Sequence, residues 1–139
     1  MAEVLNQAGI QELLDNSPFI SFMGLQVISL DPEQGVIVIK MPMRPEFERR
    51  GGTGQIHGGA IAALIDIAGD YALVMRVGVG VPTINFRTDY LRPASDQHLT
   101  ATATVRQAGR SIAVVDVDVH DGNGKLIAVG RGTYSMNAG

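Results

Sequence analysis

A glycine-rich turn followed by an apolar helix that carries one carboxylate gives this chain its clearest chemical signal. From Gly54 the chain passes through His57, Gly58 and Gly59 into an alanine-rich segment, and Asp66 lies two turns further on. Glycines at a helix N-terminus leave backbone N–H groups uncovered, and the partial positive charge there favours a developing anion. Asp66 is suited to act as a base or a nucleophile. An oxyanion site combined with a carboxylate indicates acyl-transfer chemistry.

Both polar side chains of this stretch also have purely structural interpretations. Asp66 is flanked by aliphatic residues, but it would have no special role if its face of the helix were solvated. For Asp70, one turn later on the same face, we expect a solvated position. His57 could simply cap the helix or fill space beside the glycines. The sequence leaves the alternatives for Asp66 and His57 open.

Other common chemistries lack their motifs. The chain has no G-x-S-x-G nucleophile elbow, and Gly51-Gly52-Thr53-Gly54 lacks the Gly-Lys-Ser/Thr ending of a phosphate-binding loop. Cysteine is absent, which excludes disulfides and thiolate metal sites. The three histidines, His57, His98 and His120, are scattered over separate segments, so we expect no metal site and no bound cofactor.

Length and composition predict one globular domain. The 139 residues are 45% hydrophobic and 18% charged, enough for a real core. A net charge of −3 and a pI near 5.5 argue against nucleic-acid binding. We find neither a signal peptide nor an apolar run of membrane-spanning length, and the lack of cysteine fits a cytoplasmic protein. We therefore predict a single domain over residues 1–139, with a helical segment over residues 1–17.

The periodicity of the apolar residues predicts an α+β fold. A short helix is expected from about Val4 to Asp15, ended by Ser17-Pro18, and a long helix from about His57 to Met75. Small residues in the long helix would let a strongly curved antiparallel sheet close around it. The expected strands are Leu25–Leu30, Gly35–Met43, Thr83–Leu91, His98–Gln107, Ser111–Asp121 and Lys125–Met136.

The spacing of the two candidate groups has a consequence for assembly. Gly58 and Asp66 are eight residues apart, which is roughly 12 Å along one helix. A carbonyl group held at the Gly58 amide is therefore out of reach of Asp66 in the same chain. If both serve one site, a second chain must supply its own Asp66, as an antiparallel helix pair about a two-fold axis would do. The motif then predicts at least a homodimer.

The sequence resembles the hotdog-fold thioesterases of the branch that contains PaaI and thioesterase superfamily member 2. That family has a glycine, two residues, His-Gly-Gly and an Asp nine residues after the His, matched here by Gly54, His57, Gly58, Gly59 and Asp66. Two further segments match the family, Thr88-Asp89-Tyr90-Leu91-Arg92-Pro93-Ala94 and the last strand from Gly124 to Thr133. The resemblance extends from about Pro18 to Met136.

The resemblance implies a hotdog fold, dimers that join into one continuous sheet, and usually a homotetramer. It also implies hydrolysis of aryl- or medium/long-chain acyl-CoA, with coenzyme A present only as part of the substrate. The Gly58 amide would polarise the thioester carbonyl, and Asp66 of a partner chain would act as general base or nucleophile. The remaining implied site residues are Thr83, which would position the attacking water, His57 and Gly59 around the substrate, and the hairpin Gly109-Arg110-Ser111 near the nucleotide.

One position departs from the family pattern. Relatives often carry Asn six residues before the motif His, where this chain has Gly51, so either Thr53, Gln55 or a nearby arginine replaces it or its role is not carried out. This departure keeps a non-catalytic acyl-CoA-binding module as the alternative function. A hotdog dehydratase needs a different His and acid arrangement, which is not evident here.

Overall fold

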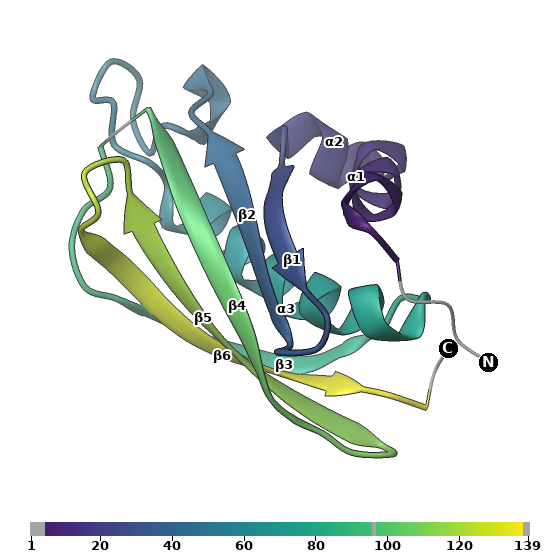
Figure 1. The fold of residues 1–139 in the computed structure, drawn as a ribbon. Coiled ribbons are helices and arrows are strands. Elements are labelled where there is room, and N and C mark those ends of the chain that lie inside the picture. The colour runs from purple at the N-terminus through teal and green to yellow at the C-terminus, as the bar shows by residue number, and fades with distance from the viewer. Residues whose placement is uncertain (1–4, 96, 138–139) are drawn as a thin grey trace.

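The computed structural model describes residues 5–95 and 97–137 and has the α+β architecture expected from the sequence. Neighbouring strands are antiparallel and lie in the order β1-β2-β4-β5-β6-β3. Figure 1 shows the sheet curving around α3, with α1 and α2 beside β1. The elements are α1 Gln7–Asn16, α2 Pro18–Met23, β1 Gln26–Asp31, β2 Val36–Pro42, the 3-10 turn Pro45–Phe47, α3 Gly58–Val77, β3 Thr83–Tyr90, β4 His98–Ala108, β5 Ile112–Asp121 and β6 Leu126–Ser135.

The core lies between α3 and the concave face of the sheet. Alternate residues of β2, such as Ile37 and Ile39, are fully buried, as the period of two predicts. Small residues on α3 permit close approach: a Cβ added at Gly69 would collide with the hydroxyl of Tyr134 on β6. The predicted curved antiparallel sheet around one long central helix, the hotdog fold, is confirmed.

The N-terminal segment differs from the expectation at one point. Ser17-Pro18 does end α1, but a second helix, α2, starts directly at Pro18. Proline is well tolerated in the first turn of a helix because the N–H it lacks would have no partner there. Gly24, with φ of 71°, ends α2 in the left-handed conformation. Residues 1–4 of the predicted N-terminal helical segment lie outside the described residues.

The two edges of the sheet differ in whether their backbone groups have hydrogen-bond partners. At β1, side chains from α1 occupy the backbone groups of the edge: Gln11 accepts a hydrogen bond from the Val27 N–H at 2.8 Å, and Gln7 donates to the Val27 carbonyl at 3.0 Å. At the other edge, β3 pairs with β6 alone among the described strands. The apolar side chains of Ile84 and Phe86 on β3 are exposed. The β3 edge is therefore open for pairing.

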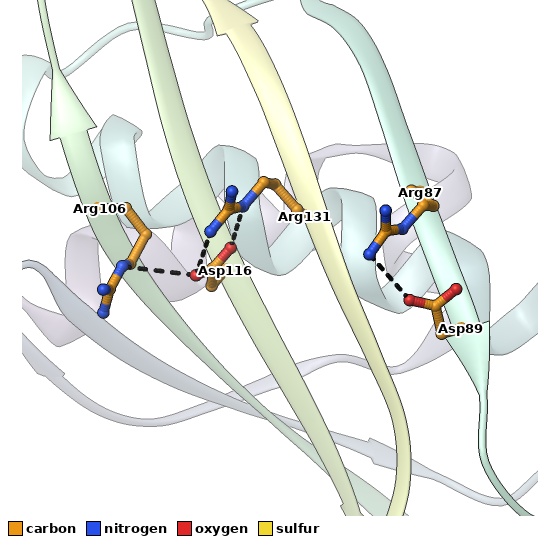
Figure 2. A network of polar contacts seen from close by, with 5 residues as sticks. All are labelled: Arg87, Asp89, Arg106, Asp116 and Arg131. Atoms are coloured by element: carbon orange, nitrogen blue, oxygen red, sulfur yellow. Dashed lines mark hydrogen bonds and ion pairs between the residues drawn. The ribbon is translucent and has the colours of Figure 1, made fainter.

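The convex face of the sheet carries two groups of paired charges. Asp116 receives two hydrogen bonds from Arg131, at 2.6 and 3.0 Å, and lies 3.4 Å from Arg106 (Figure 2). Arg87 and Asp89 on β3 form a second pair at 3.1 Å. The hydrogen bonds from Arg131 lower the pKa of the Asp116 carboxyl. The contacts of Asp116 with Arg131 on β6 and Arg106 on β4 are cross-strand pairs that favour this register of the sheet, whereas Arg87 and Asp89 pair within β3.

Candidate active site

The Asp66 carboxylate is held by a residue from the neighbouring strand. Thr83 Oγ1, on the first residue of β3, donates a hydrogen bond to Asp66 Oδ1 at 2.7 Å. Further along β3, Asn85 and Arg87 line a hollow on the convex face of the sheet, which is the face turned away from α3. The pairing of β3 with β6 is irregular between Thr83 and Asn85, and such a bulge re-aims side chains. The structure thus brings two predicted site residues together.

A buried tyrosine on β6 contacts the same turn of α3. Tyr134 Oη donates to the backbone carbonyl oxygen of Asp66 at 2.9 Å, and the side chain is fully buried. Its ring occupies space left by two glycines, because a Cβ added at Gly132 would lie 2.5 Å from Tyr134 Oη, and one at Gly69 would also collide with it. Burial raises the pKa of the Tyr134 phenol, which therefore stays neutral. The sequence analysis missed this residue, although glycines within the long helix and within the last strand were a signal for it.

Asp70 departs from the expectation of a solvated position. It is half-buried and accepts one long hydrogen bond, 3.4 Å from the Val81 N–H. Burial raises the pKa of its carboxyl to about 7, the Val81 N–H opposes this, and the nearby Asp66 adds to it. α3 therefore presents two carboxyl groups, one turn apart, toward the segment that leads into β3.

At the start of α3 some backbone groups are hydrogen-bonded to described residues of the chain, and the Gly58 N–H is not. His57 is the N-cap residue, and its Nδ1 accepts a hydrogen bond from the Gly59 N–H at 2.8 Å. The Gly58 carbonyl accepts from Tyr90 Oη at 2.7 Å. No hydrogen-bond partner for the Gly58 N–H is found within residues 5–95 and 97–137. Capping is thus what His57 does in the structure, and the Gly58 N–H is left for an external acceptor.

The separation of Gly58 and Asp66 persists in the structure, because both lie on one continuous helix, α3. Their eight-residue spacing corresponds to roughly 12 Å. One chain therefore contains both groups but cannot present them to the same carbonyl carbon.

The predicted nucleotide-binding hairpin lies at the opposite end of β3 from Gly58. The Ser111 carbonyl accepts from the Met136 N–H at 2.8 Å, and the Ser135 N–H donates to Pro82 next to the start of β3. Tyr90, which contacts Gly58, lies at the other end of the strand, roughly 23 Å away at 3.3 Å per residue. The structure therefore does not bring Gly109, Arg110 and Ser111 to Gly58 of the same chain.

Two hollows of different chemistry meet at His57. One, of about 560 Å³, is bordered by Gly58, Tyr90 and the cationic side chains of Arg49 and Arg92. The other, of about 280 Å³, lies between α2 and α3 and is mainly apolar. Gln55, which was named as a substitute for the family Asn, lines the cationic hollow, whereas the space around Gly51 is open.

Two further possibilities find no support within the part of the chain that the structure describes. No group of three or more His, Cys, Asp or Glu side chains there could hold a metal ion. No helix there has the length and apolarity needed to cross a bilayer.

Comparison with known proteins supports the resemblance to hotdog-fold thioesterases found in the sequence. The family model of the thioesterase superfamily matches residues 53–128. The chain is 27% identical to YigI of Escherichia coli, named a medium/long-chain acyl-CoA thioesterase, over 86% of this chain and 85% of that protein. Zebrafish thioesterase superfamily member 2 superposes with a TM-score of 0.84 at 28% identity and covers 96% of this chain and 99% of its own. PaaI of the E. coli phenylacetic acid degradation operon gives 0.81 at 29% identity, covering 95% and 93%.

The fold and the site together define a hotdog-fold protein with a helix N-terminus and a carboxylate on the same central helix. The chain belongs to the thioesterase superfamily. The resemblance found in the sequence is confirmed, with both PaaI and thioesterase superfamily member 2 among its structural neighbours.

Proposed function

We propose that the protein hydrolyses acyl-CoA thioesters at sites built from two chains. One observation carries the proposal: α3 holds both a Gly58 N–H without a partner among the described residues and an Asp66 carboxylate that Thr83 holds in place. These two groups are too far apart to act on one substrate within one chain. A two-fold axis that sets two α3 helices antiparallel would bring Gly58 of one chain to Asp66 of the other. The acyl-CoA thioesterase activity in the name of YigI supports the substrate class.

The open edge of β3 supports the dimer. Exposed backbone groups and apolar side chains on an edge strand favour pairing with another chain, and α1 blocks the opposite edge. Pairing of two β3 strands would extend the sheet across both chains and place two α3 helices side by side. We propose a homodimer as the minimal active unit and a homotetramer as its further assembly.

The proposed reaction uses the two groups in complementary roles. The Gly58 N–H stabilises the negative charge that develops on the thioester oxygen when the carbonyl carbon becomes tetrahedral. The partner chain's Asp66 takes a proton from a water molecule as the water oxygen attacks that carbon. The C–S bond then breaks, the thiolate of coenzyme A leaves and accepts a proton, and the free acid is released. Thr83 fixes one oxygen of Asp66 by its hydrogen bond, so the other is free to face the water.

Asp66 could instead attack the carbonyl carbon itself, which would expel the thiolate and leave a mixed anhydride for water to cleave. A single-turnover hydrolysis of the thioester in ¹⁸O-labelled water, with enzyme in excess, tests for the anhydride route. Label recovered on Asp66 identifies the anhydride route, because general-base catalysis leaves the Asp66 oxygens unchanged.

For coenzyme A, the cationic hollow beside Gly58 is the best-placed surface within one chain. Arg49 and Arg92 line it, and guanidinium groups suit phosphate. Gly109, Arg110 and Ser111 remain a proposed nucleotide contact that only a partner chain could bring to this Gly58, because their own end of β3 is remote from it.

Subunit mixing tests the composite site. Gly58→Pro removes the N–H while keeping a residue that suits the first helical position, and the extended backbone of His57 is compatible with a following proline. Asp66→Asn removes the carboxylate at nearly constant shape. Each variant alone should lose hydrolysis measured with a thiol reagent. Equal mixing after denaturation and refolding should restore about a quarter of wild-type activity, because half of the dimers are mixed and each contains one intact site.

Recovery in the mixture contradicts a site within one chain, whereas its absence contradicts the composite site. Wild-type turnover by Asp66→Asn alone would remove the proposed mechanism. Binding of acyl-CoA with no turnover by wild type would favour the non-catalytic module instead.

A further inference from the structure

One peptide group at the start of α3 is held at both ends by side chains. The peptide group between Gly58 and Gly59 offers its carbonyl oxygen to Tyr90 Oη, which donates a hydrogen bond at 2.7 Å. Its N–H, which belongs to Gly59, donates to His57 Nδ1 at 2.8 Å. The Gly58 N–H lies on the preceding peptide group, and the two planar groups meet at the Gly58 Cα. The direction of the Gly58 N–H therefore depends on how firmly the peptide group after it is fixed.

Two consecutive glycines make this direction depend on contacts from outside the helix. Gly58 and Gly59 lack the Cβ that restricts backbone torsions, so their peptide groups can reorient at little steric cost. Gly58 is the first residue of α3, and the first N–H groups of an α-helix have no acceptor within the helix. Neither a side chain nor a helical hydrogen bond therefore holds the Gly58 N–H in place. Side chains from other parts of the chain have to do so.

The ring of Tyr90 lies against Gly58 as well as bonding to it. A Cβ added at Gly58 would lie 3.2 Å from Tyr90 Oη and 3.2 Å from the ring carbon that carries it, which is tighter than ordinary contact. The Tyr90 side chain is nevertheless 53% exposed. A hydroxyl on an exposed side chain can bond to water instead, so burial does not force this contact. The contact is better explained by its effect on Gly58.

Strand β3 holds both groups of the proposed reaction. Thr83, its first residue, donates to the Asp66 carboxylate, and Tyr90, its last residue, donates to the Gly58 carbonyl. Seven residues separate the two, so a regular strand would point their side chains to opposite faces. The pairing with β6 is irregular between Thr83 and Asn85, where β3 carries one extra residue and the alternation is reversed. Both side chains consequently reach α3.

We propose that Tyr90 is a positioning residue that keeps the Gly58 N–H directed at the thioester oxygen. This rests on the proposed function in assigning that N–H to the oxygen. Tyr90 acts through the Gly58 carbonyl and takes no part in proton transfer. A hydrogen-bond donor stabilises the transition state most when it is already in place as the negative charge develops. Loss of the Tyr90 hydroxyl should therefore slow the chemical step and leave substrate binding largely unchanged.

Steady-state hydrolysis of octanoyl-CoA by Tyr90→Phe tests this role. The ring remains, so the hollow beside Gly58 keeps its wall. We expect kcat to fall about tenfold, which is part of the effect of removing an oxyanion donor outright, with KM within about twofold. Tyr71→Phe makes the same exchange at a half-buried position of α3 and should behave as wild type.

A second measurement observes the Gly58 N–H directly and requires no turnover. His57-Gly58 is the only His-Gly pair in the sequence, so histidine labelled with ¹³C at the carbonyl and ¹⁵N-labelled glycine select this one amide in an NMR spectrum. Tyr90→Phe should shift and broaden this signal, because the neighbouring peptide group loses one of its two anchors. Tyr71→Phe should leave the signal unchanged. Partial unfolding would only weaken the signal at its original position, so it is distinguished from loss of positioning.

Two results would overturn the proposal. One is a Gly58 signal that stays in its wild-type position in Tyr90→Phe. The other is an unchanged kcat of Tyr90→Phe beside an inactive Asp66→Asn, which would leave the proposed function standing. Turnover that survives Asp66→Asn would instead contradict the proposed function, and with it the reaction in which this proposal places Gly58.

Discussion

Replacement of Asp70 by Asn should stabilise the folded protein at alkaline pH and have little effect near pH 4. Burial raises the pKa of Asp70 to about 7 from an ordinary value of 3.8, because α3 and the segment before β3 keep water from the carboxyl. The single long hydrogen bond from Val81 is too weak to offset this burial. Asn keeps an oxygen acceptor for the Val81 N–H but never has to carry a charge.

The sign and size follow from proton linkage. As pH rises, the unfolded chain releases the Asp70 proton near 3.8, while the folded chain holds it to about 7, so wild-type stability falls across this interval and levels off above it. At about 1.4 kcal/mol per pKa unit, the full loss is on the order of 4 kcal/mol. The Asp70→Asn variant lacks this loss. Its advantage over wild type should therefore grow from pH 4 to pH 8.

Urea unfolding at pH 4.5 and 8.5, at one fixed protein concentration, measures the difference. Asp118→Asn is a matched control, because it makes the same exchange at an exposed position on β5. An equal stability difference between Asp70→Asn and wild type at both pH values would refute the reasoning. A variant less stable than wild type at pH 8.5 would do so as well.

Three further changes test the contacts that hold Asp66 and its turn of α3. Thr83→Val removes the hydrogen bond to Asp66 at constant shape, so kcat should fall about tenfold with little change in KM, measured by steady-state kinetics. Tyr134→Phe should cost about 1 kcal/mol in urea unfolding, because only the bond to the Asp66 carbonyl is lost. Gly69→Ala should cost about 1 to 3 kcal/mol through collision with the Tyr134 hydroxyl, and adding Tyr134→Phe should recover part of it. Strict additivity of the last two changes would contradict the packing described for this tyrosine.

The sequence sufficed for those parts of the fold that follow from periodicity. The alternation along β2 and the small residues of α3 predicted a curved sheet around one helix, and both are confirmed. Helix α2 was missed because Pro18 signals the end of one helix and the start of another equally well. Local patterns cannot choose between the two without knowing what packs against the following residues.

The site was predictable only where a motif carried it. Gly58 and Asp66 stand out by residue type and spacing. Thr83 follows from the family resemblance, whereas the bulge beside it in β3 is seen only in the structure. Asp70 and Tyr134 were not recognised, because their properties come from burial between elements distant in the sequence. Desolvation depends on what the assembled fold packs against a side chain. The helical spacing of Asp70 therefore could not predict it, and the expectation of a solvated position was wrong.

The open edge of β3 also determines how a failure of assembly would be observed. A strand with unpaired backbone groups and exposed apolar side chains can recruit any other extended chain, and repeated recruitment has no natural end. Closed two-fold pairing consumes the edge after a single event. Substitutions that weaken the proposed pairing of two β3 strands should therefore lower the yield of dispersed protein, with precipitate rather than well-behaved monomers as the visible product.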